Sequence, residues 1–199
     1  MSKIVNSTIG IAGCGTMGLP MLEVLLKNNI NAFGYDILSK ENFLSLENNF
    51  ISSKKDFFQK VDIIFSVVRD INQTKELCEG KNGLFQLNSP KTLIISSTLS
   101  PAFLNDFFQN APENITMIEA PMSGAPMKAK DATLTFMVGA EKNQYENILP
   151  ILNILGEKIR INEELSKDDP EFLELKSKLE NNPADKKKAD VKSAFFLLS

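Results

Sequence analysis

Short apolar runs alternate with longer stretches of mixed polarity up to about Asn162. The apolar runs are rich in β-branched residues, as buried strands are. In the stretches between them, apolar residues recur at intervals of three and four, as on one face of a helix. Strands are therefore expected in STIGIAG, NAFGYD, VDIIFSVV, KTLIISST, ITMIEAPM, TLTFMVGA and KIRIN. This alternation predicts an α/β fold with a doubly wound, mostly parallel sheet.

The first helix is expected from about Met17 to Asn29. Its apolar positions fall at i, i+4, i+7 and i+8, namely Met17, Met21, Val24 and Leu25. They give the helix one face that can pack on a sheet. Further helices are expected in SKKDFFQK, INQTKELCEG, PAFLNDFFQN and EKNQYENILPILNILG. VDIIFSVV is apolar almost throughout, which is typical of a parallel strand with helices on both faces.

The composition changes near the C-terminus. Residues 163–199 are dense in charge and contain no glycine. Asp169 followed by Pro170 predicts a helix start, and Pro183 ends that helix and opens another. We expect a sheet domain over residues 1–162 and a short, charged helical appendage over residues 163–199 that docks on it. For the lysine run within the appendage, a solvated tail is an equal alternative.

Composition and charge narrow the function classes. Hydrophobic residues make up 43% of the 199 positions and charged residues 24%, as in an ordinary globular protein with a core. The net charge of -3 gives no electrostatic reason to expect nucleic acid or an anionic membrane surface. The N-terminus lacks the apolar stretch of a signal peptide, and no later run is long enough to span a bilayer. Cys14 and Cys78 are the only cysteines and lack metal-ligand spacing, so a cytoplasmic protein without a metal centre is expected.

The absence of histidine excludes several chemistries. Ser-His-Asp hydrolysis, Cys-His catalysis and histidine zinc sites all need an imidazole. Proton transfer in this protein must therefore use a lysine, aspartate, glutamate, tyrosine or cysteine side chain, or solvent.

The stretch IGIAGCGTMGLPM, from Ile9 to Met21, carries Gly13, Gly15 and Gly18 between the first expected strand and the first expected helix. Gly13 can make a tight turn, Gly15 lets the backbone approach a diphosphate without a Cβ in the way, and Gly18 lets the helix pack closely on the strand. The free N–H groups and the positive dipole end of the helix would receive the diphosphate. This context favours a Rossmann-type dinucleotide site over a purely structural turn.

An acidic residue, Asp36, ends the second expected strand, NAFGYD. It is placed to accept hydrogen bonds from both hydroxyls of an adenosine ribose. Its carboxylate would repel a 2′-phosphate, and no arginine follows it in DILSK, so NAD is expected rather than NADP. Ser39 and Lys40 could soften that preference.

Four motifs follow one another along the chain: GIAGCGTMGLPM, DIIFSVVRD, LIISSTLSP and EAPMSGAP, the last continued by ATLTFMVGA. Together they resemble the β-hydroxyacid dehydrogenase family, which includes 3-hydroxyisobutyrate dehydrogenase and is related to 6-phosphogluconate dehydrogenase. Order and spacing agree over about residues 7 to 160. The resemblance implies an NAD(P)-dependent oxidoreductase that moves a hydride between nicotinamide and a small 3-hydroxy acid.

The resemblance also implies roles for individual residues. The implied cofactor-binding residues are Gly13, Cys14, Gly15, Thr16, Met17, Gly18, Asp36, Val68, Arg69 and Thr98. Val68 and Arg69 stand where the family has a Leu-Pro turn that contacts the cofactor, and Thr98 would face the nicotinamide end. Ser123 and Gly124 would hold the substrate carboxylate through a hydroxyl and a backbone N–H. An ordinary turn after a strand is the alternative for these two.

Structural explanations compete for other residues in this set. Thr98 could cap the helix that follows it, although a cap does not require the Ser-Thr pair found there. For Arg69 and Asp70, a solvated loop pair is the preferred interpretation. Cys14 and Met17, between the glycines, are expected to pack rather than to react.

The family's catalytic lysine motif is not found. In the family, a glycine-rich turn and a long helix with that lysine follow the sheet domain, and an all-helical domain completes the cleft. Here GEKIRIN runs straight into EELSKDDPEF without a K-x-x-N-N pattern, and the chain ends well short of what the resemblance implies for a complete enzyme. Lys192, in ADVKSAFFLL, is the one lysine in a moderately apolar helix that could take that place. A solvated lysine is the commoner explanation.

Two functions therefore stay open. The first is an oxidoreductase of the 3-hydroxyisobutyrate dehydrogenase type, either active as it stands or the N-terminal part of a truncated gene. The second is a catalytically silent NAD-binding module that acts through partners. A homodimer also stays open, because the apolar AFFLL near the C-terminus invites association unless it folds back.

Overall fold

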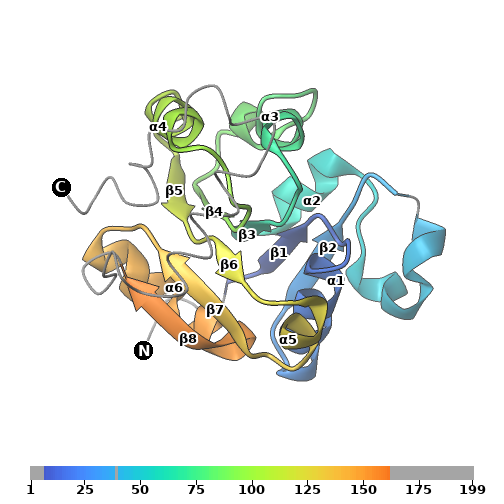
Figure 1. Ribbon diagram of the computed structural model, residues 1–199. Helices are drawn as coiled ribbons and strands as arrows, with labels where there is room; N and C mark the ends of the chain where they lie inside the picture. Colours follow the sequence, from blue (N-terminus) through green and yellow to red (C-terminus); the bar gives the residue numbers. More distant parts are fainter. Residues whose placement is uncertain (1–6, 39, 162–199) are drawn as a thin grey trace.

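A computed structural model describes residues 7–38 and 40–161 of the chain. Within them the chain forms an α/β fold in which a parallel sheet lies between two layers of helices (Figure 1). This confirms the fold class expected from the alternation of strands and helices. The expected appendage over residues 163–199, with Lys192, lies outside the described residues. No helix in the described part combines the length and the apolar character needed to cross a membrane.

Five parallel strands form the central sheet in the order β2-β1-β3-β4-β5. Their bounds are β1 (Ile9–Ala12), β2 (Ala32–Tyr35), β3 (Ile63–Ser66), β4 (Lys91–Ile95) and β5 (Ile115–Glu119). In register, Ile9 lies opposite Ala32 on one side and Ile63 on the other. The strand order reverses between β1 and β3, and a sheet of this kind leaves a crevice at the carboxyl ends of the strands beside such a reversal.

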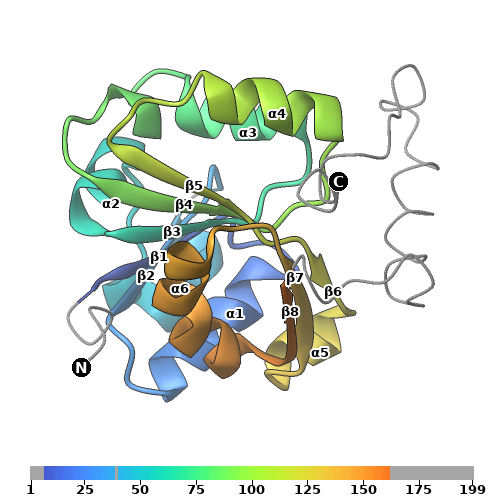
Figure 2. The same cartoon turned by 90° about the vertical axis from the view of Figure 1, so that its left-hand side faces the viewer.

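Helices cover both faces of this sheet (Figure 2). The helices are α1 (Gly18–Lys27), α2 (Lys54–Lys60), α3 (Ile71–Cys78), α4 (Pro101–Gln109) and α6 (Lys142–Leu155), with 3-10 segments at Lys40–Asn49 and Leu84–Gln86. One buried cluster joins β1 to α1 and α6, and a second joins the opposite face to α2, α3 and α4. The apolar face expected on the first helix is confirmed, because Met21, Val24 and Leu25 are all buried.

Polar side chains fix the beginnings of most of these helices. Ser53, Asp70 and Ser100 each accept a hydrogen bond from a backbone N–H in the first turn of α2, α3 and α4. At α6, the backbone N–H of Glu141 donates to the side chain of Gln144. Helix α1 differs, because Met17 precedes it and no side chain caps it. Its first N–H groups are therefore left to partners other than a capping side chain.

A second, smaller sheet lies beside the carboxyl end of β5 (Figure 1). It contains β6 (Met122–Ser123), β7 (Leu134–Val138) and β8 (Gly156–Ile161), with β6 antiparallel to β7 and β8 parallel to it. The backbones of Glu119 and Gly139 exchange two hydrogen bonds, of 3.3 and 2.8 Å, and so join the two sheets. The expected strand ITMIEAPM thus divides into β5 and β6, and a short helix, α5 (Pro126–Lys130), follows that the sequence pattern did not predict.

Candidate functional site

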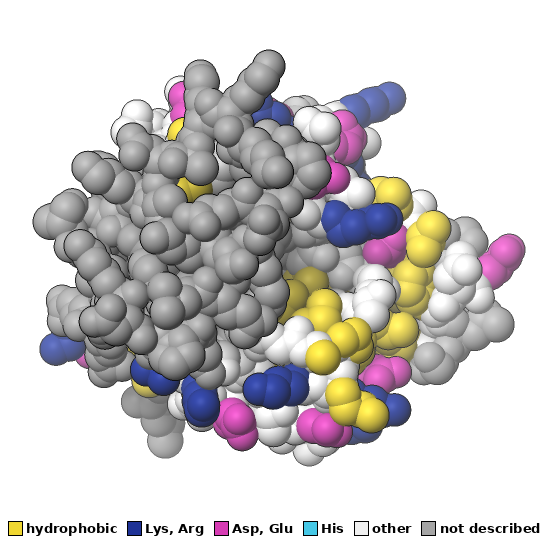
Figure 3. All heavy atoms as spheres, viewed as in Figure 1, with side chains coloured by type: hydrophobic (Ala, Val, Ile, Leu, Met, Phe, Trp, Pro, Cys, Tyr) yellow, Lys and Arg dark blue, Asp and Glu magenta, His cyan; other side chains and the backbone are white. Residues whose placement is uncertain are grey.

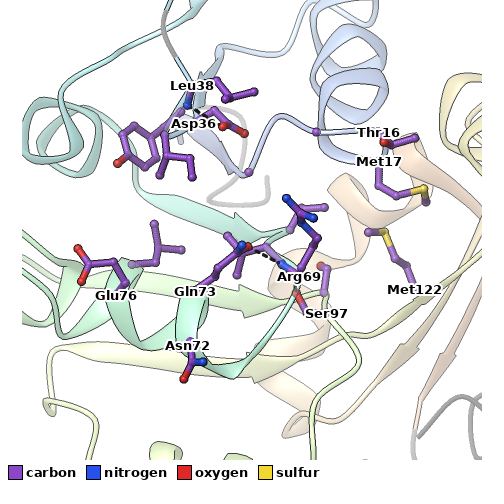
Figure 4. Close-up of a pocket in the computed structure, with 18 of the residues that line it drawn as sticks. Thr16, Met17, Asp36, Leu38, Arg69, Asn72, Gln73, Glu76, Ser97 and Met122 are labelled. Atoms are coloured by element: carbon purple, nitrogen blue, oxygen red, sulfur yellow. Dashed lines mark hydrogen bonds between the residues drawn. The ribbon is translucent and has the colours of Figure 1, made fainter. Parts of the chain in front are cut away.

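A cavity of about 910 Å³ lies at the carboxyl ends of the central strands. Its walls come from the glycine loop after β1, the turn after β2, the start of α2, the loops after β3 and β4, one side of α3, and β6 with the residue after it. In Figure 4, Asp36 and Leu38 lie at one end of this space and Met17 and Met122 at the other, with Arg69 between them. On the face shown in Figure 3, hydrophobic side chains gather to the right of centre, over the region where β2 and α1 lie in Figure 1.

Gly13 makes the tight turn expected of the first glycine in the loop. Its φ is +99°, a conformation that side chains disfavour. A Cβ at Gly13 would also lie 2.7 Å from the carbonyl oxygen of Val67. Its N–H donates to the carbonyl of Tyr35 at 2.8 Å. The turn is therefore held between the loops that follow β2 and β3.

Gly15 and Gly18 differ in what a side chain at their positions would meet. A Cβ on Gly18 would overlap the carbonyl oxygen of Gly13 and crowd the side chain of Ile11, so only a glycine lets α1 start this close to β1. A Cβ on Gly15 would meet no atom of the described residues within 4 Å. Gly15 lines the cavity. Close packing thus explains Gly18, whereas nothing in the described protein requires a glycine at position 15.

Between these glycines, Cys14 is a core residue, as expected. Only 2% of it is exposed, and its thiol donates to the carbonyl of Ile11 at 3.6 Å. Burial, and next the negative charge of Asp36, raise the pKa of the Cys14 thiol to about 12. The thiol therefore stays protonated and does not act as a nucleophile. Met17 is half-buried against the core, and Thr16 and Met17 both line the cavity.

Asp36 follows β2 directly and lines the cavity, half-buried. Its Oδ1 accepts a hydrogen bond from the backbone N–H of Leu38 at 3.0 Å, which fixes the orientation of the carboxylate. The backbones of β1 and β2 are paired up to Ala12 and Tyr35. Asp36 therefore follows the strand that neighbours the glycine loop, and its contact with a ribose stays a prediction.

The loop after β3 brings Val68 and Arg69 to the wall of the cavity. The backbone N–H of Arg69 donates to Oε1 of Gln73 at 3.0 Å, and Asp70 accepts from the backbone N–H of Gln73 at 2.9 Å. Arg69 and Asp70 are both exposed, as in the solvated pair that we expected. They nevertheless have separate roles, because Asp70 caps α3 and Arg69 faces the cavity.

Thr98 also lines the cavity, half-buried in the loop after β4. The alternative that Thr98 caps the following helix is wrong, because Ser100 takes that role by accepting from Phe103 N–H at 3.3 Å. Ser97, beside Thr98, donates its hydroxyl to the carbonyl of Val68 and so ties the loops after β3 and β4 together.

The segment expected to hold a substrate is only partly at the cavity. Gly124 lines it with a φ of +146°, and Met122 lines it as well. Ser123, between them, is 8% exposed and lies opposite Thr135 in the small sheet. Ser123 is not one of the described residues that line the cavity, so its contact with a substrate stays a prediction.

Residues 8–162 match the family described as the NAD binding domain of 6-phosphogluconate dehydrogenase. The chain belongs to this family. The suspected relationship to hydroxyacid dehydrogenases is thereby confirmed, and so is the NAD(P) cofactor that it implied. The geometry fits such a cofactor, since the uncapped helix start, the open space at Gly15 and the carboxylate of Asp36 all face one cavity.

Individual relatives agree with this assignment. The chain is 30% identical over 164 residues to 2-(hydroxymethyl)glutarate dehydrogenase of Eubacterium barkeri, covering 76% of this chain and 52% of the relative. It is 27% identical over 162 residues to mitochondrial 3-hydroxyisobutyrate dehydrogenase of Rattus norvegicus, covering 79% and 48%. The solved structure of Mycobacterium tuberculosis 3-hydroxyisobutyrate dehydrogenase has the same fold, with a TM-score of 0.67, 23% identity, and coverage of 78% and 54%. The chain spans about half the length of the curated relatives it matches.

One end of the cavity in this NAD-binding domain contains residues that the sequence analysis did not single out. Lys54 Nζ lies 2.8 Å from Oε1 of Glu76 and donates to the backbone carbonyl of Glu76 as well. Tyr35 lines the same end, and burial, followed by the charges of Asp36 and Glu76, raises the pKa of its hydroxyl. A sequence signal existed only for α3, where the polar positions Asn72, Gln73 and Glu76 share one helix face. It did not indicate which way that face points.

Glu119 is a buried carboxyl group that does not line the cavity. It ends β5 with only 7% of its surface exposed. Burial raises the pKa of Glu119 from 4.5 to about 8. Its side chain is therefore mostly neutral at pH 7, at the point where the two sheets of the NAD-binding domain join.

Proposed function

We propose that the chain binds NAD in preference to NADP and moves a hydride between the nicotinamide and a small 3-hydroxy acid. One observation carries the proposal: an unexplained glycine, Gly15, and a fixed carboxylate, Asp36, face the same cavity from neighbouring strands. A dinucleotide accounts for both, because its diphosphate needs close backbone approach and its ribose needs an acceptor.

The residues of the glycine loop hold the diphosphate in this proposal. The N–H groups at the start of α1 carry no side-chain cap, and the helix dipole places about half a positive charge there. Asp36 accepts from the ribose hydroxyls, while the N–H of Leu38 keeps its carboxylate in place. The same carboxylate disfavours a 2′-phosphate at this position, which is the basis of the preference for NAD.

The nicotinamide end would lie at Thr98 and Met122, with Gly124 beside it. The bound nicotinamide supplies the hydride acceptor or donor. The backbone N–H of Gly124 and the hydroxyl of Ser123 are the proposed contacts of the substrate carboxylate. A proton must leave the substrate oxygen when the hydride leaves its carbon, and a base does this work. Lys192 is the candidate that the sequence offers for this base, in place of the family's catalytic lysine. Relatives named for 3-hydroxyisobutyrate and 2-(hydroxymethyl)glutarate support a small hydroxy acid as substrate.

Calorimetry with the purified full chain tests cofactor binding. We expect heat of binding for NAD and an affinity for NADP that is about tenfold lower or worse, since a 2′-phosphate would face Asp36. An absorbance assay at the NADH band, with a panel of small 3-hydroxy acids, then tests turnover. Turnover lost in Lys192→Ala supports the proposed base. Absence of heat for both dinucleotides at millimolar concentration would overturn the proposal, and binding without turnover would replace it with the silent NAD-binding module.

A further inference from the structure

We propose that Arg69 binds the diphosphate of the dinucleotide from the side opposite the glycine loop, as a cationic clamp. This inference rests on the proposed binding of NAD in the cavity. It assigns to Arg69 a role that determines how strongly the chain holds any ligand with a diphosphate.

The charges that line the cavity lead to this assignment. Among the described residues, the charged lining side chains are Asp36, Lys54, Arg69 and Glu76. Lys54 and Glu76 neutralise each other in an ion pair of 2.8 Å. Asp36 accepts a hydrogen bond from the N–H of Leu38 and is the proposed ribose contact. The guanidinium of Arg69 makes no hydrogen bond or ion pair with the described residues. It is therefore the cation that remains available to an anionic ligand.

The backbone that carries Arg69 is fixed against the glycine loop. Val67 donates its N–H to the carbonyl of Ala12 at 2.8 Å, and its own carbonyl oxygen lies 2.7 Å from the position of a Cβ on Gly13. Ser97 holds the carbonyl of Val68 through its hydroxyl, and Gln73 holds the N–H of Arg69. The backbone of this loop is therefore already ordered, and it loses little conformational entropy when a ligand binds.

The side chain of Arg69, in contrast, points into the open space. In Figure 4 it extends from the loop after β3 into the gap between Asp36 and Met17, toward the glycine loop. The side chain is exposed, so its charge is solvated when no ligand is bound. Its N–H groups are then free to donate to a ligand. The fork of guanidinium N–H groups matches two oxygens of a phosphate.

The charge balance explains why a clamp is needed here. The four lining charges sum to zero, since two cations oppose two anions. The start of α1 supplies only about half a positive charge, against the two negative charges of a diphosphate. Arg69 would supply a full charge on the other face of the ligand, while the Lys54–Glu76 pair stays bound to itself.

The test measures dissociation constants for Arg69→Gln, with Lys142→Gln as the matched control. Lys142 is an exposed lysine at the start of α6 that does not line the cavity. The ligands are NAD, ADP-ribose and adenosine, the last without a diphosphate. We expect Arg69→Gln to weaken NAD and ADP-ribose by about tenfold, to leave adenosine unchanged, and to lower the slope of log Kd against log salt. Arg69→Lys should recover part of the loss, and Lys142→Gln should match the wild type.

Each contrary result has a separate meaning. Wild-type affinity for NAD in Arg69→Gln overturns the clamp and leaves the proposed function intact. An equal loss for adenosine also overturns it, because the loss is then unrelated to the diphosphate. If the wild type binds none of the three ligands, the proposed function fails, and the clamp with it.

Discussion

The carbonyl oxygen of Gly13 occupies the space that a Cβ on Gly18 would need. Gly18→Ala must therefore push α1 away from β1 or distort the loop. We expect the free energy of unfolding to fall by about 1–3 kcal/mol, as for overpacking in a core. This loss outweighs the gain of about 1 kcal/mol that alanine brings to a helix in place of glycine. Urea denaturation measures it, and an unchanged midpoint would show that the helix start tolerates a side chain.

Gly15→Ala is the matched change three residues earlier. The described neighbours leave room for its Cβ, so we expect the free energy of unfolding to stay within about 0.5 kcal/mol of the wild type. The added methyl would instead occupy the surface that the diphosphate approaches. NAD affinity should fall at least about tenfold, by steric exclusion of the ligand. Calorimetry on both glycine variants separates the two effects. Full NAD affinity in Gly15→Ala would contradict the placement of the diphosphate.

Asp36→Asn tests the ribose contact without removing the turn. The asparagine oxygen can still accept from the N–H of Leu38, the hydrogen bond that the carboxylate makes at 3.0 Å. The negative charge is lost, however, so a 2′-phosphate is no longer repelled. We expect NAD to bind about three- to tenfold more weakly and the preference for NAD over NADP to shrink or reverse. Dissociation constants for both dinucleotides measure this, and an unchanged ratio would remove Asp36 from cofactor choice.

The glycine loop shows how much of the structure can be predicted from local sequence. The strand before it, the helix after it and the separate needs of Gly13 and Gly18 all follow from short-range geometry, and the structure reproduces them. The position of Asp36 after β2, at the cavity, follows for the same reason, because a parallel strand pair fixes where the next strand ends. The small sheet was harder to predict. ITMIEAPM is one apolar run, but the chain turns after Glu119, where the second sheet joins the first through Gly139.

The rest of the cavity could not be predicted because it depends on how helices are rotated and loops are packed. Lys54 and Glu76 meet across two helices, 22 positions apart in sequence, and no local pattern brings them together. Ser123 belongs to a motif that contacts substrate in the resemblance, yet it is buried opposite Thr135 in the small sheet and is not one of the residues that line the cavity. A slip of one position in a strand moves every side chain to the other face of the sheet. A motif alone therefore does not determine which of its side chains reach the cavity.

Ser100 and Thr98 form a second matched pair. Ser100→Ala removes the side chain that accepts from the N–H of Phe103, and we expect a loss of about 1 kcal/mol in the free energy of unfolding. Thr98→Ala removes no helix cap, so stability should change by less than about 0.5 kcal/mol, while affinity for NAD or substrate falls. Thermal unfolding and calorimetry on both variants measure this. Destabilisation by Thr98→Ala without an effect on binding would return Thr98 to a purely structural role.

Glu119 predicts a pH dependence of stability. Burial raises its pKa from 4.5 to about 8, so the folded chain keeps the proton over a range in which the unfolded chain has released it. The unfolded state then binds fewer protons, and the free energy of unfolding falls as the pH rises from about 4.5 to about 8, then levels off. Glu119→Gln keeps the shape of the side chain and removes the ionisation. Relative to this variant, the wild type should lose about 2 kcal/mol between pH 6 and pH 8.

The control for Glu119→Gln is Glu113→Gln, which removes a carboxylate at an exposed position before β5. Urea denaturation of the three proteins at both pH values isolates the contribution of the buried group, because the other carboxylates are common to all. Glu119→Gln should flatten the pH dependence and Glu113→Gln should leave it as in the wild type. Parallel slopes for the wild type and Glu119→Gln would mean that the Glu119 carboxyl ionises in the folded state as it does in water. The junction of the two sheets beside Gly139 would then have to admit solvent to the carboxyl group.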